Sequence, residues 1–354
     1  MKRSILFLTP LLLLFSFPII TEAQLSYELL EGEIDSSPYK IAVPENWADG
    51  KVFFHVHGWR PADAPHEANL NPDDPFYQSL LNDGWLIART ASTQNGADHE
   101  TYTQSIYELK EWIESNTGQV QLTILEGEST AGTLVLQIAE NNPDLADGVI
   151  AMGAFVELND PDSDSFLMAN PEIPAILMSN LTELDGPVAY AAKSENAQVQ
   201  PMLRPLLRPG HVNVNHVERY DALKDLQSRI KSGDFSTITD GTRQVPARET
   251  ETTHENGSIV NQITTIDWYF GNLELGFHPD EFAGLGIEQG QWFILEIDGQ
   301  QRDVFYGESY GDVEQGQWVA FPHANDHILV ARNHEHAANT VGVQVGNRIK
   351  ILPK

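Results

Sequence analysis

Short apolar stretches alternate with amphipathic stretches through roughly the first two thirds of the chain. Apolar runs of strand length occupy residues 51–56, 85–88, 120–125, 148–152, 173–178 and 202–207. Between them, residues 75–82, 102–115, 133–142 and 215–231 have apolar side chains at helical spacing. This alternation predicts an open, mostly parallel sheet covered by helices. Two earlier extended runs, at 27–34 and 39–43, predict a hairpin at its edge.

The pattern changes after residue 231. Residues 232–257 are dominated by Ser, Thr, Asp, Glu and Gly, which is typical of an exposed linker. Residues 258–354 contain short β-type runs separated by turns such as Asp298-Gly299, which predicts a small β-barrel or sandwich. The expected fold class is therefore an α/β domain at 24–231, followed by a small all-β barrel domain at 258–354.

The N-terminus has the pattern of a secretory signal. Lys2 and Arg3 precede an apolar run, and small residues around Ala23 offer a cleavage site after residues 1–23. Pro10 and Pro18 make an uncleaved anchor less favourable. The 354-residue sequence contains no cysteine, which fits a secreted or periplasmic protein of bacterial type.

Composition limits the partners that we expect. The formal net charge is −30, so nucleic acid and an anionic membrane surface would both be repelled. Such an excess of acid suits a salty exterior, and it equally suits solubility alone. An apolar content of 41% is that of a globular protein with a sizeable core.

One segment combines a strand, a serine and a helix. The apolar run at 120–125 leads into Gly127-Glu128-Ser129-Thr130-Ala131, and a helical pattern follows. A serine on such a sharp turn needs small neighbours, and the start of the following helix offers free backbone N–H groups. The segment therefore predicts a nucleophile elbow, although Ala131 stands where the usual pattern has glycine.

Candidates for the other catalytic groups follow later strands. The run at 51–56 ends in His57-Gly58, so we expect the backbone N–H groups of Trp59 and Thr130 to form an oxyanion hole. The loop after 173–178 offers Asp185 as the triad acid, with Glu183 as the alternative. His211 follows the last strand and is the expected base, because His216 would fall at the start of a helix.

Residues from about 39 to 231 resemble the α/β-hydrolase family in its esterase and peptidase-like branch. The resemblance rests on the elbow, on His57-Gly58 and on the order Ser129, Asp185, His211. It implies a serine hydrolase that forms an acyl-enzyme with a small ester or peptide substrate, and it calls for no metal and no organic cofactor. The choice of esterase or peptidase, the substrate and the oligomeric state stay open.

The barrel domain has a resemblance of its own. The segments 266–272, 309–312 and 328–333 are similar to the C-terminal β-barrel of the S-adenosylmethionine hydroxide adenosyltransferases and fluorinases. That similarity implies possible ligand contacts at Phe270, Asn272, Asn325 and Arg332. Because the catalytic half of those enzymes is replaced here, we expect packing, homo-oligomer contacts or nucleoside-like binding. The alternative function is thus a nucleoside- or S-adenosylmethionine-like ligand-binding protein with an inactive hydrolase half.

Overall fold

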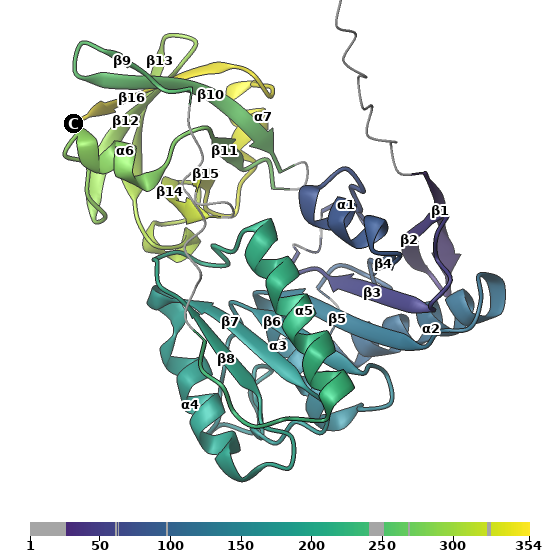
Figure 1. The fold of residues 1–354 in the computed structure, drawn as a ribbon. Coiled ribbons are helices and arrows are strands. Elements are labelled where there is room, and N and C mark those ends of the chain that lie inside the picture. Colours follow the sequence, from purple (N-terminus) through teal and green to yellow (C-terminus); the bar gives the residue numbers. More distant parts are fainter. Residues whose placement is uncertain are drawn as a thin grey trace, which may run out of the picture.

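The computed structural model describes residues 26–60, 62, 64–96, 98–240, 251–267, 270–323 and 327–354. The predicted signal at 1–23 and the middle of the predicted linker lie outside these residues. The described residues form an α/β domain and a β-barrel (Figure 1). None of the described helices is both long enough and apolar enough to cross a membrane.

The α/β domain is built on one sheet with the strand order β1-β2-β4-β3-β5-β6-β7-β8. The strands from β3 onward are parallel, whereas β1 and β2 form the predicted antiparallel edge hairpin. Their bounds are β1 Tyr27–Ile34, β2 Ser37–Pro44, β3 Lys51–Val56, β4 Leu86–Thr90, β5 Leu122–Glu128, β6 Gly148–Met152, β7 Ala175–Asn180 and β8 Met202–Leu206. This order, with the serine turn after β5, is that of the α/β-hydrolase fold.

Helices cover both faces of the sheet. α1 (Pro75–Asn82) and α5 (His216–Ser232) pack on one face, and α2 (His99–Asn116), α3 (Thr130–Asn141) and α4 (Asp185–Lys193) pack on the other (Figure 1). Alternation along β3 explains the two cores, because Phe54 faces one helical layer and Phe53 the other. Both rings are almost fully buried.

The barrel is closed by β11, which pairs with both β10 and β15. Its strands are β10 Ser258–Ile266, β11 Leu273–Leu275, β12 Gln291–Ile297, β13 Gln300–Tyr306, β14 Trp318–His323, β15 His327–Arg332 and β16 Arg348–Pro353, with β9 Thr253–Glu255 added on β10. α6 (Pro279–Gly284) places Phe282 in an aromatic core beside Phe293. α7 (Ala337–Val341) follows β15.

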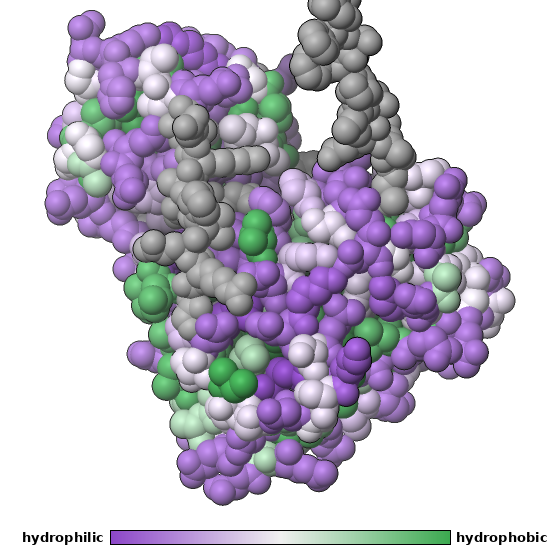
Figure 2. All heavy atoms as spheres, in the orientation of Figure 1, coloured by the Kyte–Doolittle hydropathy of each residue, from purple (hydrophilic) through white to green (hydrophobic). Residues whose placement is uncertain are grey.

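The structure describes both ends of the predicted linker. Residues 237–240 run along β8, where Leu203 exchanges backbone hydrogen bonds with Ile238 and Asp240. Residues 253–255 already belong to the barrel sheet as β9. The face of the protein drawn in Figure 2 is mostly hydrophilic, with small separate hydrophobic patches, in keeping with the net charge of −30.

Candidate active site

Ser129 lies on the turn between β5 and α3, as the sequence predicts. Its φ of 57° and ψ of −123° are unusual for a residue other than glycine, a conformation that costs on the order of 1–3 kcal/mol and needs support from its surroundings. Its N–H donates to the carbonyl of Met152 at 2.8 Å. A Cβ atom on Gly127 would lie 2.1 Å from the carbonyl oxygen of Ala131, so only glycine fits before the elbow. The turn is a nucleophile elbow in geometry.

His211 and Glu183 complete a chain of hydrogen bonds from the serine. The Nε2 atom of His211 is 2.9 Å from Ser129 Oγ, and its Nδ1 atom is 2.5 Å from Glu183 Oε2. A carboxylate only accepts, so Nδ1 carries the proton and Nε2 is free to accept the serine proton. The imidazole and carboxylate side chains are 18% and 19% exposed, so both are mostly shielded from water.

The sequence favoured Asp185 as the acid partner of His211, with Glu183 as the alternative. In the structure Glu183, and not Asp185, contacts His211. After β7 the chain makes a short 3₁₀ turn, η1 (Leu181–Glu183), and this turn presents Glu183 to the imidazole. Asp185 is already the first residue of α4. The sequence offered two carboxylates two residues apart, and only the path of the backbone after β7 separates them.

The residues expected to form the oxyanion hole flank the serine. Thr130 is the first residue of α3, where an N–H has no acceptor within the helix. The backbone of Gly58 comes so close that a Cβ atom there would lie 3.4 Å from Ser129 Cβ. The Nδ1–H of His57 donates to the Gly58 carbonyl at 2.7 Å, and this fixes the peptide unit whose N–H belongs to Trp59. Burial holds the pKa of His57 well below its usual range, so the ring is neutral.

A buried ion cluster that was not predicted from the sequence lies directly below the elbow. Glu126 on β5 is fully buried, accepts two hydrogen bonds from Arg219 on α5 and lies 3.1 Å from Nδ1 of His55 on β3. Burial alone would raise the pKa of Glu126, but Arg219 and His55 lower it to about 2. The guanidinium carbon of Arg219 also lies 3.9 Å from the ring centroid of Phe76. The presence of Glu126 directly after an apolar run could have indicated this cluster from the sequence.

The barrel faces the loops that carry these groups. The rings of Trp59 and His334 meet edge to face at 5.9 Å. A Cβ atom on Gly210 would lie 2.6 Å from the carbonyl oxygen of Pro322 on β14. Burial lowers the pKa of His323, which lies near ionisable groups of both domains, such as Glu274 and Glu128. The barrel therefore covers the edge of the sheet that carries Ser129 and His211.

Of the four residues expected to contact a ligand in the barrel, the structure describes three. Asn272 is buried and donates through Nδ2 to the hydroxyl of Tyr310 at 3.1 Å, and Phe270 is half-buried in the turn before it. Arg332 is bound to protein atoms, namely the carbonyl of Gly316 and the side chains of Thr340 and Glu335. Asn325 lies outside the described residues.

One cavity lies away from the serine site. It has a volume of about 600 Å³ and is lined by residues of α2 and α3 such as Gln104, Leu134 and Gln137, and by none of the residues of the serine site. The hydrogen-bonded chain at Ser129 is the stronger indication of chemistry, because it combines strain, a base and an acid. Among the described residues, no group of three or more His, Cys, Asp or Glu side chains is arranged to hold a metal ion.

A comparison with protein-family models found a match in the C-terminal part of the chain. Residues 261–350 match the family model of the SAM hydroxide adenosyltransferase C-terminal domain, which confirms the resemblance expected for the barrel. No curated protein matches the sequence.

The similar solved structures cover different shares of the chain. An uncharacterized conserved protein from Thermotoga maritima covers 36% of this chain at 18% identity, with a TM-score of 0.28. Pyrococcus horikoshii acylaminoacyl peptidase covers 64% at 12% identity and a TM-score of 0.45. A putative dienelactone hydrolase from Klebsiella pneumoniae covers 58% at 13% identity and a TM-score of 0.43, and 98% of its own length is matched. The chain spans only 49% and 44% of the length of the first two structures.

Proposed function

We propose that this protein is a serine hydrolase that cleaves carboxylic esters, with amides as weaker substrates, through an acyl-enzyme. The observation that carries the proposal is the continuous hydrogen-bonded chain from Ser129 Oγ through His211 to Glu183, at 2.9 and 2.5 Å. These distances are short enough for proton transfer without rearrangement. The strained turn at Ser129 adds weight, because such strain gathers at functional sites.

Each residue has a defined part in the reaction. Ser129 Oγ attacks the substrate carbonyl while His211 Nε2 takes its proton, and His211 then protonates the leaving alcohol. Glu183 holds the Nδ1–H tautomer and stabilises the imidazolium that forms. The N–H groups of Trp59 and Thr130 stabilise the tetrahedral oxyanion, and water repeats the sequence to release the acid.

A fluorophosphonate probe tests the proposal directly. The mature protein should be labelled at Ser129 and should hydrolyse short-chain aryl esters, and Ser129→Ala should do neither. Ser79→Ala, which changes a half-buried serine on α1, is the matched control and should behave as wild type. Labelling of Ser129→Ala at the wild-type rate would end the proposal. A panel of esters and peptide amides then separates esterase from peptidase.

The location and the second candidate function need separate tests. We propose export, supported by the signal-like pattern at 1–23; protein recovered outside the cytoplasm should begin at Gln24 by mass spectrometry. The family match of residues 261–350 favours nucleoside-like binding by the barrel as a second candidate. Calorimetric titration with adenosine and S-adenosylmethionine tests it, and the absence of heat for both would remove it.

A further inference from the structure

The loop that carries His211 is held in a strained conformation. It joins β8 to α5 without regular structure. Val212, the residue after the base, has a φ of +53°, a value that β-branched residues rarely adopt. Gly210, the residue before it, has a φ of +124°. Strain of this kind persists only where neighbouring contacts enforce it, so something must hold this loop.

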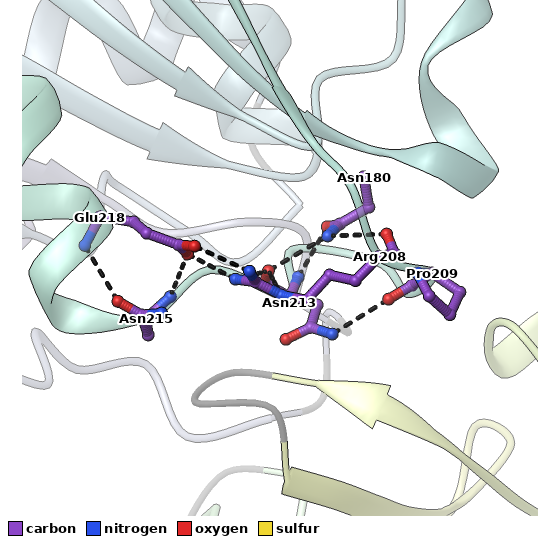
Figure 3. A network of polar contacts seen from close by, with 6 residues as sticks. All are labelled: Asn180, Arg208, Pro209, Asn213, Asn215 and Glu218. Carbon is purple, nitrogen blue, oxygen red and sulfur yellow. Dashed lines mark hydrogen bonds and ion pairs between the residues drawn. The ribbon is translucent and has the colours of Figure 1, made fainter. Parts of the chain in front are cut away.

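One set of holding contacts comes from Arg208 (Figure 3). Its guanidinium group forms a two-pronged contact with Glu218 on α5, with Nη1 2.7 Å from Oε1 and Nη2 bonded to Oε2. The same group donates to the carbonyl of Asn213 from Nη2 at 2.7 Å and from Nε at 3.1 Å. Glu218 is buried and also accepts the N–H of Asn215 at 3.0 Å, in the capping box of α5. Both ends of the His211 loop are therefore tied to the start of one helix.

A second set joins the His211 loop to the loop that carries Glu183. Asn180, the fully buried last residue of β7, accepts the N–H of Asn213 at 2.8 Å and donates to its carbonyl at 3.1 Å (Figure 3). Nearer the base, Thr182 Oγ donates to the carbonyl of Gly210 at 2.7 Å. The acid and the base thus lie on two loops that are bonded to each other on both sides of His211.

We propose that Arg208, Asn180 and Glu218 are positioning residues for the hydrolysis, acting as a clamp that holds His211 between Ser129 and Glu183. Among the described contacts, Ser129 and His211 form no side-chain hydrogen bond with any of the three, so these residues act through the loop backbone. The inference rests on the proposed function. A loop released from the clamp relaxes away from the strained geometry, and the nucleophile then loses its base while the substrate surface is unchanged.

The chain offers a matched control for Arg208. Arg204 on β8 is buried and pairs with Asp225 on α5 and with Asp240, but its contacts among the described residues do not reach the His211 loop. Arg208→Met and Arg204→Met therefore each remove an arginine bridge to a carboxylate on α5, the first from the His211 loop and the second from β8. Arg208→Met should lower kcat about 100-fold with little change in KM, because small misplacements of catalytic groups cost about that much. Arg204→Met should keep the wild-type kcat.

The clamp is also tested by conservative variants. Arg208→Lys keeps the positive charge but cannot form the two-pronged contact with Glu218. Its kcat should therefore fall between those of the wild type and Arg208→Met. Asn180→Ser should lower kcat as well, and the double variant with Arg208→Lys should lose less than the product of the single effects, because both side chains hold Asn213. If Arg208→Met does not fold, these two variants carry the test. Wild-type kcat in folded Arg208 and Asn180 variants, or an equal loss in Arg204→Met, would overturn the proposal.

A proton NMR measurement separates this inference from the proposed function. The Nδ1–H of His211, bonded to Glu183, should give a low-field resonance that Glu183→Gln removes. The resonance should broaden or disappear in Arg208→Met and persist in Arg204→Met. If the wild-type protein hydrolyses no ester, the proposed function fails, while this resonance still reports whether the clamp holds His211. An unchanged resonance in Arg208→Met would contradict the clamp whatever the activity.

Discussion

Exchange of Glu183 for glutamine is the sharpest perturbation of the candidate site. The carboxylate oxygen lies 2.5 Å from His211 Nδ1, and both side chains are mostly shielded from water. When His211 takes the serine proton, an ion pair forms with charge centres about 4 Å apart, worth about 4 kcal/mol at an effective dielectric constant of about 20. At about 1.4 kcal/mol per factor of ten, its loss slows the reaction about a thousandfold.

The glutamine adds a second penalty. Its amide can turn an N–H toward the imidazole and favour the tautomer whose Nε2 carries the proton, which cannot accept from Ser129. We therefore expect kcat for an aryl acetate to fall about 10³- to 10⁴-fold, with KM nearly unchanged, and fluorophosphonate labelling to slow in parallel. The folded state should be little affected, which a melting curve checks.

Asp185→Asn is the matched control, since it removes the same charge two residues further along. This variant should keep kcat within about twofold of wild type, because Asp185 is exposed and solvent screens its charge from His211. The reasoning would be refuted by a thousandfold loss in Asp185→Asn, or by Glu183→Gln retaining more than a tenth of the wild-type rate.

Three further predictions concern the support of the site. The pKa of Glu126 is about 2 in the folded protein, against an ordinary value of 4.5. Ionised Glu126 therefore contributes fully to the free energy of unfolding above pH 4.5, and this contribution is lost as the pH falls toward 2. Urea unfolding should show Glu126→Gln less stable than wild type by about 3–5 kcal/mol at pH 7, because Arg219 is left unpaired, with the gap narrowing at pH 3. Gly127→Ala should lower the melting temperature and abolish probe labelling, since its Cβ would lie 2.1 Å from a backbone carbonyl oxygen, whereas Gly284→Ala has open space and should be tolerated. Gly210→Ala should lower kcat and separate the calorimetric unfolding of the two domains, because its Cβ would lie 2.6 Å from a β14 carbonyl oxygen; a single unshifted transition would contradict this.

Much of the fold and part of the site follow from local patterns. The apolar runs and helical spacing predict the parallel sheet, because side-chain periodicity reports which faces are buried. The glycine-flanked serine after β5 predicts the elbow, since only small residues fit that turn. The positions of Ser129 and His211 after β5 and β8 then follow from strand order, because the carboxyl ends of parallel strands lie at the same edge of the sheet.

By itself the sequence determined the order of a mostly parallel sheet and a β-barrel, the serine turn after β5 and the loop that carries His211. Only the tertiary structure decided that Glu183 and not Asp185 meets His211, that Arg208 and Asn180 brace the loop, and that the barrel lies against Gly210 and Trp59. The physical reason is range: burial and turn preferences act between neighbours in the chain, whereas these contacts join segments whose meeting depends on the path of every strand between them.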